Sequence, residues 1–180
     1  LGTEVPVREV LRAPSLAALA ARIDATATDR PPLRRYDDPE PAPIAPAQRR
    51  LALVSRAEPG TTAYLVPVVL TLRGDLDVDA LTAAVGDVIE RHRVLRTAFP
   101  GDRQLLVDAP TLEHSAPEDV SAAVAATLTT PVGITAEPPL RIRLFDVEPH
   151  TWVLAAAVHH IAFDGASVAP LLADLFTAYG

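Results

Sequence analysis

The stretch WVLAAAVHHIAFDG, residues 152–165, joins an apolar run to two adjacent histidines and an Asp-Gly pair. Its first part, Trp152 to Val158, predicts a buried strand, since a short run of almost purely apolar residues is typical of strands inside a sheet. The histidines follow where this strand ends, so an imidazole that titrates near neutral pH would lie at the mouth of the sheet. There it could take or steer a proton. Gly165 would let the backbone turn tightly into the next segment.

Two adjacent histidines alone leave several interpretations open. Both residues could simply end the strand, with one of them packed and hydrogen-bonded in the core. A metal site is a weaker alternative, because neighbouring residues of a strand point to opposite faces and cannot both reach one ion without a bent backbone. Proton chemistry by one of the two imidazoles is the third.

On both sides of this stretch, helical patterns alternate with strand patterns. Asp77 is suited to cap a helix that runs to His92, because Leu81, Val85, Val88 and Ile89 fall on one face. Further helices are predicted at 47–57, 118–128 and 167–179, and further strands at 64–73, 95–99, 104–107 and 140–147. This order predicts the α/β or α+β class with a mixed sheet.

The N-terminal part of the chain has a different character. Apolar residues at helical spacing predict a short helix, a turn and a second helix at 16–23, which Ser15 would cap. From Ala25 onward, repeated prolines favour an extended and fairly stiff segment. We therefore expect three parts: residues 1–24, a Pro-rich linker at 25–45, and a domain at 46–180.

Composition removes several classes of function. Of the 180 residues 49% are hydrophobic, which is enough for a core, and the net charge of -7 disfavours a nucleic-acid partner. There is no cysteine, so thiol nucleophiles and zinc-thiolate sites are excluded, which fits a reducing compartment. No apolar run approaches the roughly 20 residues that span a bilayer, and no export signal opens the sequence. We expect a cytoplasmic protein without a membrane partner, and a chain that is a piece of a longer one.

Three segments, in this order, resemble motifs of the condensation domains of nonribosomal peptide synthetases. Residues 159–165, HHIAFDG, match the HHxxxDG signature. Residues 91–99, RHRVLRTAF, resemble RHxxLRTxF, and residues 46–51, PAQRRL, resemble SxAQxRL with Ala45 where serine is usual. The resemblance implies a chloramphenicol acetyltransferase-like fold and identifies residues 46–180 as similar to the N-terminal lobe of such a domain.

Residues 5–20, VPVREVLRAPSLAALA, are similar to the closing helices of a peptidyl carrier domain. The serine that bears the carrier's arm would lie before Leu1, so none is assigned here. The resemblance implies upstream and downstream carrier domains as partners, with thioester substrates on their 4'-phosphopantetheine arms. It also implies a second lobe that completes the domain, and no cofactor or metal on this chain.

The resemblance also implies roles for individual residues. His160 would be catalytic, as a general base or by positioning the amine, and His159 structural. Asp164 would organise the loop through a salt bridge, for which Arg96 is the candidate partner. Gly165 would allow close backbone approach at the start of the last helix. No chemistry requires Gln48, which is expected only to pack.

The function implied is formation of a peptide bond between an acyl or peptidyl thioester and an aminoacyl amine, each on a carrier. Without the second lobe, the chain alone should be catalytically incomplete. One alternative is an inactive condensation-like module that recruits a tailoring enzyme, and another is an epimerization domain of the same fold. The intact histidine motif favours the first interpretation.

Overall fold

A computed structural model describes residues 5, 7–25 and 41–180 of the chain. The chain divides into two compact units, residues 1–38 and residues 39–180. No helix in the described part is long and apolar enough to cross a membrane.

The first unit contains helices α1 (Val7–Arg12) and α2 (Leu16–Ala25). The Oγ of Ser15 accepts a hydrogen bond of 3.2 Å from the backbone N–H of Ala18, which is the expected N-terminal cap of α2. No residue of these two helices is buried, and four of their large apolar side chains are exposed: Val7, Val10, Leu11 and Leu16. The described residues of the first unit therefore leave its apolar surface uncovered.

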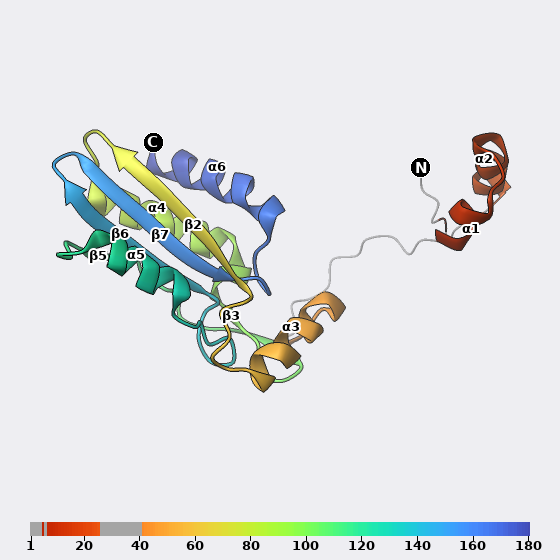
Figure 1. The fold of residues 1–180 in the computed structure, drawn as a ribbon, viewed down its shortest axis with the longest axis horizontal. Coiled ribbons are helices and arrows are strands. Elements are labelled where there is room, and N and C mark those ends of the chain that lie inside the picture. Colours follow the sequence, from red (N-terminus) through yellow and green to blue (C-terminus); the bar gives the residue numbers. More distant parts are fainter. Residues whose placement is uncertain (1–4, 6, 26–40) are drawn as a thin grey trace. The chain divides into compact units, whose positions relative to one another are not determined.

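The second unit is built on a four-stranded mixed sheet in the order β2-β7-β6-β5 (Figure 1). The strands are β2 (Leu65–Arg73), β5 (Glu113–Ser115), β6 (Leu140–Glu148) and β7 (Thr151–His159). All neighbours are antiparallel except β5 and β6, which run parallel. The α/β class with a mixed sheet is thereby confirmed.

Helices cover both faces of this sheet, with α4 (Val78–Arg91) and α6 (Val168–Tyr179) on one face and α5 (Val120–Thr129) on the other (Figure 1). Each of α4 and α5 begins at an aspartate cap. The Oδ1 of Asp77 accepts from the N–H of Ala80, and that of Asp119 from the N–H of Ala122, both at 2.9 Å. The N-terminal cap expected at Asp77 is present.

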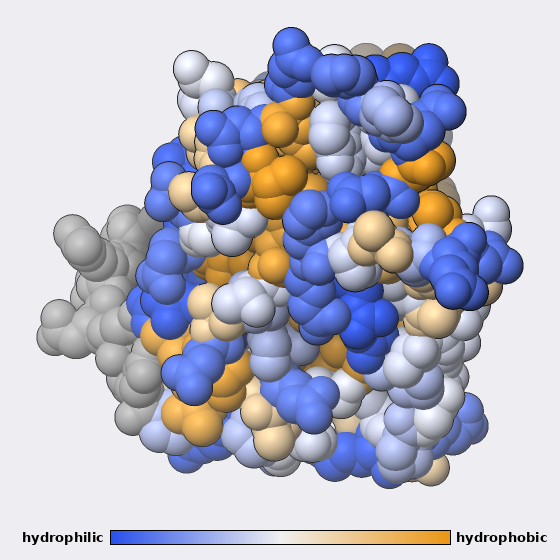
Figure 2. Space-filling model, turned by 90° about the vertical axis from the view of Figure 1, so that its left-hand side faces the viewer, coloured by the Kyte–Doolittle hydropathy of each residue, from blue (hydrophilic) through white to orange (hydrophobic). Residues whose placement is uncertain are grey.

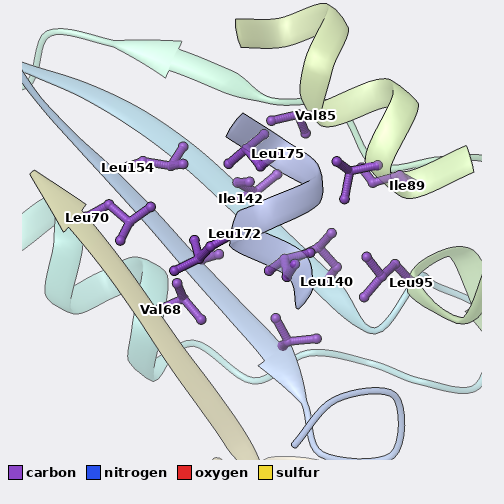
Figure 3. A pocket seen from close by; sticks show the side chains of 14 residues that line it. Val68, Leu70, Val85, Ile89, Leu95, Leu140, Ile142, Leu154, Leu172 and Leu175 are labelled. Carbon is purple, nitrogen blue, oxygen red and sulfur yellow. The ribbon is translucent and has the colours of Figure 1, made fainter. Parts of the chain in front are cut away.

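Strand β7 is buried on both faces, as its apolar run predicts. Leu154, Ala156 and Val158 belong to the core with α4 and α6, while the alternating Ala155 and Ala157 are fully buried on the opposite face. A cavity of about 40 Å³ remains between the sheet and the two helices, and only aliphatic side chains line it (Figure 3). A cavity without polar groups offers water no partners.

A smaller sheet, in the order β1-β4-β3, lies in the same unit. It contains β1 (Ala42–Pro43), β3 (Thr97–Ala98) and β4 (Arg103–Leu106). Helix α3 (Pro46–Ala57) follows β1.

The structure differs from the sequence expectations in several places. Residues 42–45, expected in the linker, lie in the second unit, because β1 pairs with β4 and Ile44 is buried. The strand expected from residue 95 begins at Thr97, because a 3₁₀ turn, η1 (Arg93–Arg96), precedes it. Strand β5 was not expected, and its three residues are exposed. Ala25, where the linker was expected to begin, is the last residue of α2, and residues 26–40 of the expected linker lie outside the described residues.

Apolar side chains also reach the surface of the second unit. Figure 2 shows hydrophobic side chains exposed among hydrophilic ones on one face of the molecule. A cavity of about 350 Å³ opens between the outer strand β2 and the C-terminal half of α6, where Phe176 is 56% exposed. The unit's own side chains therefore leave part of its apolar surface uncovered.

Candidate active site

The three motif segments meet in a small core below the histidine loop. Ala52 of α3, Phe99 after β3 and Ile161 of the loop are buried together, with Ile44 and Ile134. The N–H of Phe99 donates a 2.6 Å hydrogen bond to the carbonyl of Ile134, which ties the segment after α5 to this core. Segments that lie far apart in the sequence thus form one support for the loop.

His159, the last residue of β7, points into the protein and is 2% exposed. Its Nδ1 accepts a 3.1 Å hydrogen bond from the N–H of Ile161, and its Nε2 lies 3.0 Å from the Oγ of Ser55. Because Nδ1 accepts, the proton of the neutral ring is on Nε2, which donates to Ser55. Burial, and then the charge of His160, lower the pKa of His159, so the neutral ring is favoured.

His160 is exposed and lies in the turn that begins where β7 ends at His159. Its backbone N–H donates to the carbonyl of Tyr64 at 2.7 Å, which anchors it to the chain just before β2. Its Nδ1 lies 2.7 Å from the carbonyl oxygen of Phe163, which can only accept, so this nitrogen carries a proton. In the neutral ring Nε2 then has a lone pair, and no described residue occupies it.

Asp164 organises the loop, but through a different partner from the one expected. Its Oδ1 accepts from the N–H of Ser167 at 3.0 Å and from the Ser167 hydroxyl at 2.7 Å, and so caps the 3₁₀ turn η2 (Gly165–Ser167) before α6. The hydrogen bond from the Ser167 hydroxyl is the largest of the causes that lower the pKa of Asp164.

The expected salt bridge between Asp164 and Arg96 is not formed. Arg96 pairs instead with Glu90 of α4, with 2.8 Å between Nη2 and Oε2. Because Arg96 lies in η1, directly after α4, its guanidinium turns toward that helix. Asp164 itself is exposed, so its charge is solvated and needs no cationic partner.

The close backbone approach expected at Gly165 is also not found within the described part of the chain. Its φ is not positive, and a Cβ at this position would meet no atom within 4 Å. The space beside Gly165 is open.

Two residues of α3, which sequence reasoning treated as ordinary or passed over, contact the loop. Gln48 donates from Nε2 to the carbonyl of Ile161 at 3.1 Å, and Ser55 bonds to His159 as described above. With the fully buried Ala52 they form one stripe of the helix, at positions i, i+4 and i+7. This spacing is the signal that could have revealed them.

His92 of the second motif connects the end of α4 to α6. Its Nε2 lies 2.6 Å from Oδ2 of Asp174 in α6, and the Nε of Arg91 lies 3.0 Å from the same oxygen. The hydrogen bond from His92 is the largest cause that lowers the pKa of Asp174. The pairs lock α4 to α6 beside the loop.

A cavity of about 270 Å³ opens on this side of the loop. Its walls come from the turn after α4, the histidine loop and the start of α6, and they include His92, Phe163, Ala166, Ser167 and Pro170. Ala166 has a small side chain, which leaves room in this cavity. Among the described residues no group of three or more potential metal ligands is found.

The fold and the loop define a layered α/β protein with one buried and one accessible histidine at the end of its central strand. The sequence pattern of the family described as "Condensation domain" matches residues 40–180. The chain therefore belongs to the condensation-domain family of nonribosomal peptide synthetases, whose fold is chloramphenicol acetyltransferase-like.

Relatives of known name agree with this assignment. The chain is 36% identical to a dimodular nonribosomal peptide synthase of Bacillus subtilis and 40% identical to an isonitrile lipopeptide synthase of Mycobacterium tuberculosis. These alignments cover 99% and 93% of this chain but only 8% and 7% of the relatives. The chain thus spans less than a tenth of their length.

Solved structures give the same result. The X-domain from teicoplanin biosynthesis, solved in complex with OxyB, is 37% identical and aligns with a TM-score of 0.76. The alignment covers 86% of this chain and 36% of that one. The starter condensation domain of rhizomide synthetase aligns with a TM-score of 0.69 at 24% identity, covering 76% of this chain and 36% of that one, which supports the fold alone.

Proposed function

We propose that the second unit is the N-terminal lobe of an active condensation domain, which forms a peptide bond between two carrier-bound substrates, with His160 as the catalytic residue. The observation that carries this proposal is the fixed orientation of its ring. The Phe163 carbonyl holds the Nδ1 proton, so Nε2 presents a lone pair from an exposed position. A neutral imidazole with a known tautomer is suited to accept a proton near neutral pH.

In the proposed reaction, the amine nitrogen of the acceptor attacks the thioester carbonyl carbon of the donor. Nε2 of His160 accepts a hydrogen bond from the attacking amine, and takes its proton if His160 acts as the base. The C–N bond forms, the C–S bond breaks, and the released thiol stays on the donor carrier. The proton that the amine loses ends on the leaving sulfur, so the thiolate is released as a thiol.

The space around the loop is large enough to admit parts of such substrates. The space beside Gly165 is open, and the cavity next to Ala166 adjoins the same loop. The second lobe would supply the opposite wall.

For the first unit we propose the closing helices of a peptidyl carrier domain. The exposed apolar face of α1 and α2 supports this, since such a face needs the rest of a domain to cover it. The synthetase relatives also align across both units, over 99% of the chain in the Bacillus subtilis case. A carrier in this place would belong to the upstream partner, with its 4'-phosphopantetheine arm attached outside this chain.

A binding role without catalysis is the second candidate. It is favoured by the similarity to the X-domain, whose structure was solved in complex with OxyB. In that case this chain would recruit a tailoring enzyme, and His160 could be replaced without effect on the product.

Transfer between loaded carriers distinguishes the two candidates. In the full-length synthetase that contains this chain, we expect His160→Ala to slow transfer by about 10²- to 10⁴-fold, because a positioned acid–base group contributes that much. The melting temperature should not change, since the side chain is exposed. His114→Ala is the matched control, because His114 pairs with Asp146 on the sheet surface and lies outside the loop. A folded His160→Ala variant with normal transfer would refute the catalytic assignment.

A further inference from the structure

Helix α3 holds the histidine loop at two points. Gln48 lies near the start of the helix and bridges two backbone groups. Its Oε1 accepts from the N–H of Ala45, and its Nε2 donates to the carbonyl of Ile161, both at 3.1 Å. The first bond caps α3, and the second reaches across 113 residues to the residue that follows His160. The bond to Ile161 is partly buried, so water competes little for it, whereas the bond from Ala45 is exposed.

Ser55 lies two turns further along α3 and holds the other end of the same segment. Its hydroxyl accepts from the Nε2 of His159, while the Nδ1 of His159 accepts from the N–H of Ile161. Because the Ile161 N–H can only donate, the neutral ring of His159 carries its proton on Nε2, and Ser55 accepts the hydrogen bond from that proton. Gln48 thus donates to the C=O of Ile161, and the N–H of the same residue donates to His159.

His160 lies between these anchored groups. Its neighbours on either side, His159 and Ile161, are both tied to α3, and its own ring is tied to the carbonyl of Phe163. A shift of Ile161 would move the backbone that carries the imidazole. A misplacement of a reacting group by about 1 Å can cost roughly a hundredfold in rate.

We propose that Gln48 and Ser55 are positioning residues. Through their bonds to Ile161 and His159, they hold His160 in the place that peptide transfer requires. This rests on the proposed catalytic function of His160. Neither residue touches the ring of His160, so each acts only through the backbone and through the neighbouring histidine.

The substitution Gln48→Glu separates the two bonds of Gln48. A glutamate can still accept from the Ala45 N–H, and a carboxylate in the first turn suits the helix N-terminus. It cannot donate to the Ile161 carbonyl while ionised. In the full-length synthetase with both carriers loaded, we expect kcat for transfer to fall about ten- to hundredfold. KM for the loaded carriers should stay within about twofold, because both bonds of Gln48 are internal to the unit.

The matched control is Gln104→Glu. Gln104 of β4 donates from Nε2 to the carbonyl of Pro43 at 2.8 Å, which is the same kind of bond in the same unit, away from the loop. This control should keep the wild-type kcat. A second pair tests Ser55: Ser55→Ala removes the acceptor of His159 and should lower kcat, whereas Ser55→Thr retains a hydroxyl and should restore most of it.

The outcomes separate the two proposals. The positioning roles are supported if kcat falls in Gln48→Glu and Ser55→Ala while the melting temperature stays unchanged. In the same experiment Gln104→Glu should keep the wild-type kcat, and Ser55→Thr should recover most of it. Wild-type kcat in both variants, together with an inactive His160→Ala, would overturn these roles and leave the catalytic assignment standing. Loss of rate that follows a lowered melting temperature, without rescue by threonine, would also overturn them. A wild-type synthetase without transfer activity would remove both proposals.

Discussion

At the end of β7, two neighbouring histidines lie in opposite environments, one in the core and one at the surface. The N–H of His159 donates to the carbonyl of Pro139 at 2.8 Å, and that of His160 to the carbonyl of Tyr64 at 2.7 Å, so the two residues are anchored toward opposite neighbouring strands. Their side chains alternate in the same way, and the first is buried while the second is exposed. One imidazole therefore becomes part of the core, and the other faces the solvent.

The buried histidine should make the stability of the unit depend on pH. Because the pKa of His159 is lowered in the folded state, the unfolded chain binds a proton below about pH 6.5 that the folded chain does not. The free energy of unfolding should then be highest above pH 6.5 and decrease as the pH falls toward the lowered folded pKa. Chemical denaturation of the chain between pH 5 and pH 8 measures this slope.

A variant isolates the contribution of His159 from those of other groups. In His159→Asn the amide oxygen can accept from the Ile161 N–H in place of Nδ1, and the side chain does not titrate. The stability difference between wild type and variant should shrink as the pH falls. A difference that is constant from pH 8 to pH 5 would mean that His159 has an ordinary pKa in the folded protein.

Among the secondary-structure elements, helix α5 depends on an arginine from the neighbouring strand. Arg141 of β6 donates to three carbonyls at the C-terminal end of α5: Thr127 at 3.4 Å, Thr130 at 2.8 Å and Pro131 at 3.0 Å. The last carbonyls of a helix have no partner within the helix, and a cation at this end also suits the helix dipole. One side chain thus fastens α5 to the sheet.

We expect Arg141→Leu to lower the free energy of unfolding by about 1.5–3 kcal/mol, as for hydrogen bonds from a charged donor. Arg143→Leu is the control on the same strand. Arg143 forms a pair of 2.7 Å with Glu113, which is 60% exposed, so its loss should cost less than about 1 kcal/mol. Urea denaturation of both variants compares them, and equal losses would show that Arg141 acts only as a surface charge.

At the scale of the whole molecule, the boundary between the two units lies before β1. Residues 42–44 contribute a strand that pairs with β4 and the buried side chain of Ile44, which packs with Phe99 and Ile161 below the histidine loop. The second unit therefore needs residues that a boundary drawn at 45 by proline content would remove.

Two truncations test this boundary. Removal of residues 1–38 should leave the melting transition of the second unit within about 2 °C of its value in the full chain, because the unit's core lies within residues 39–180. Removal of residues 1–45 should lower it by about 10 °C, since loss of a buried isoleucine alone costs roughly 2–5 kcal/mol. Equal melting temperatures for the two truncations would place the boundary at 45.

The sequence by itself determined the elements that have strong patterns and the position of the histidine loop. The apolar run of β7, the helical stripe of α4 and the cap at Asp77 depend on neighbours within a few residues, so local rules predict them. The three motifs likewise consist of contiguous residues, and so the amino-acid sequence alone is enough to recognise the family. Strand β5 is three exposed residues without alternation, and no local pattern distinguishes it.

Only the tertiary structure decided which side chains meet around the loop. Arg96 pairs with Glu90 rather than Asp164, because the 3₁₀ turn aims it at α4. Gln48 and Ser55 reach Ile161 and His159 across more than a hundred residues of sequence. Such bonds depend on where the packed helices and sheet place two distant segments, which is a property of the assembled layers and not of either segment alone.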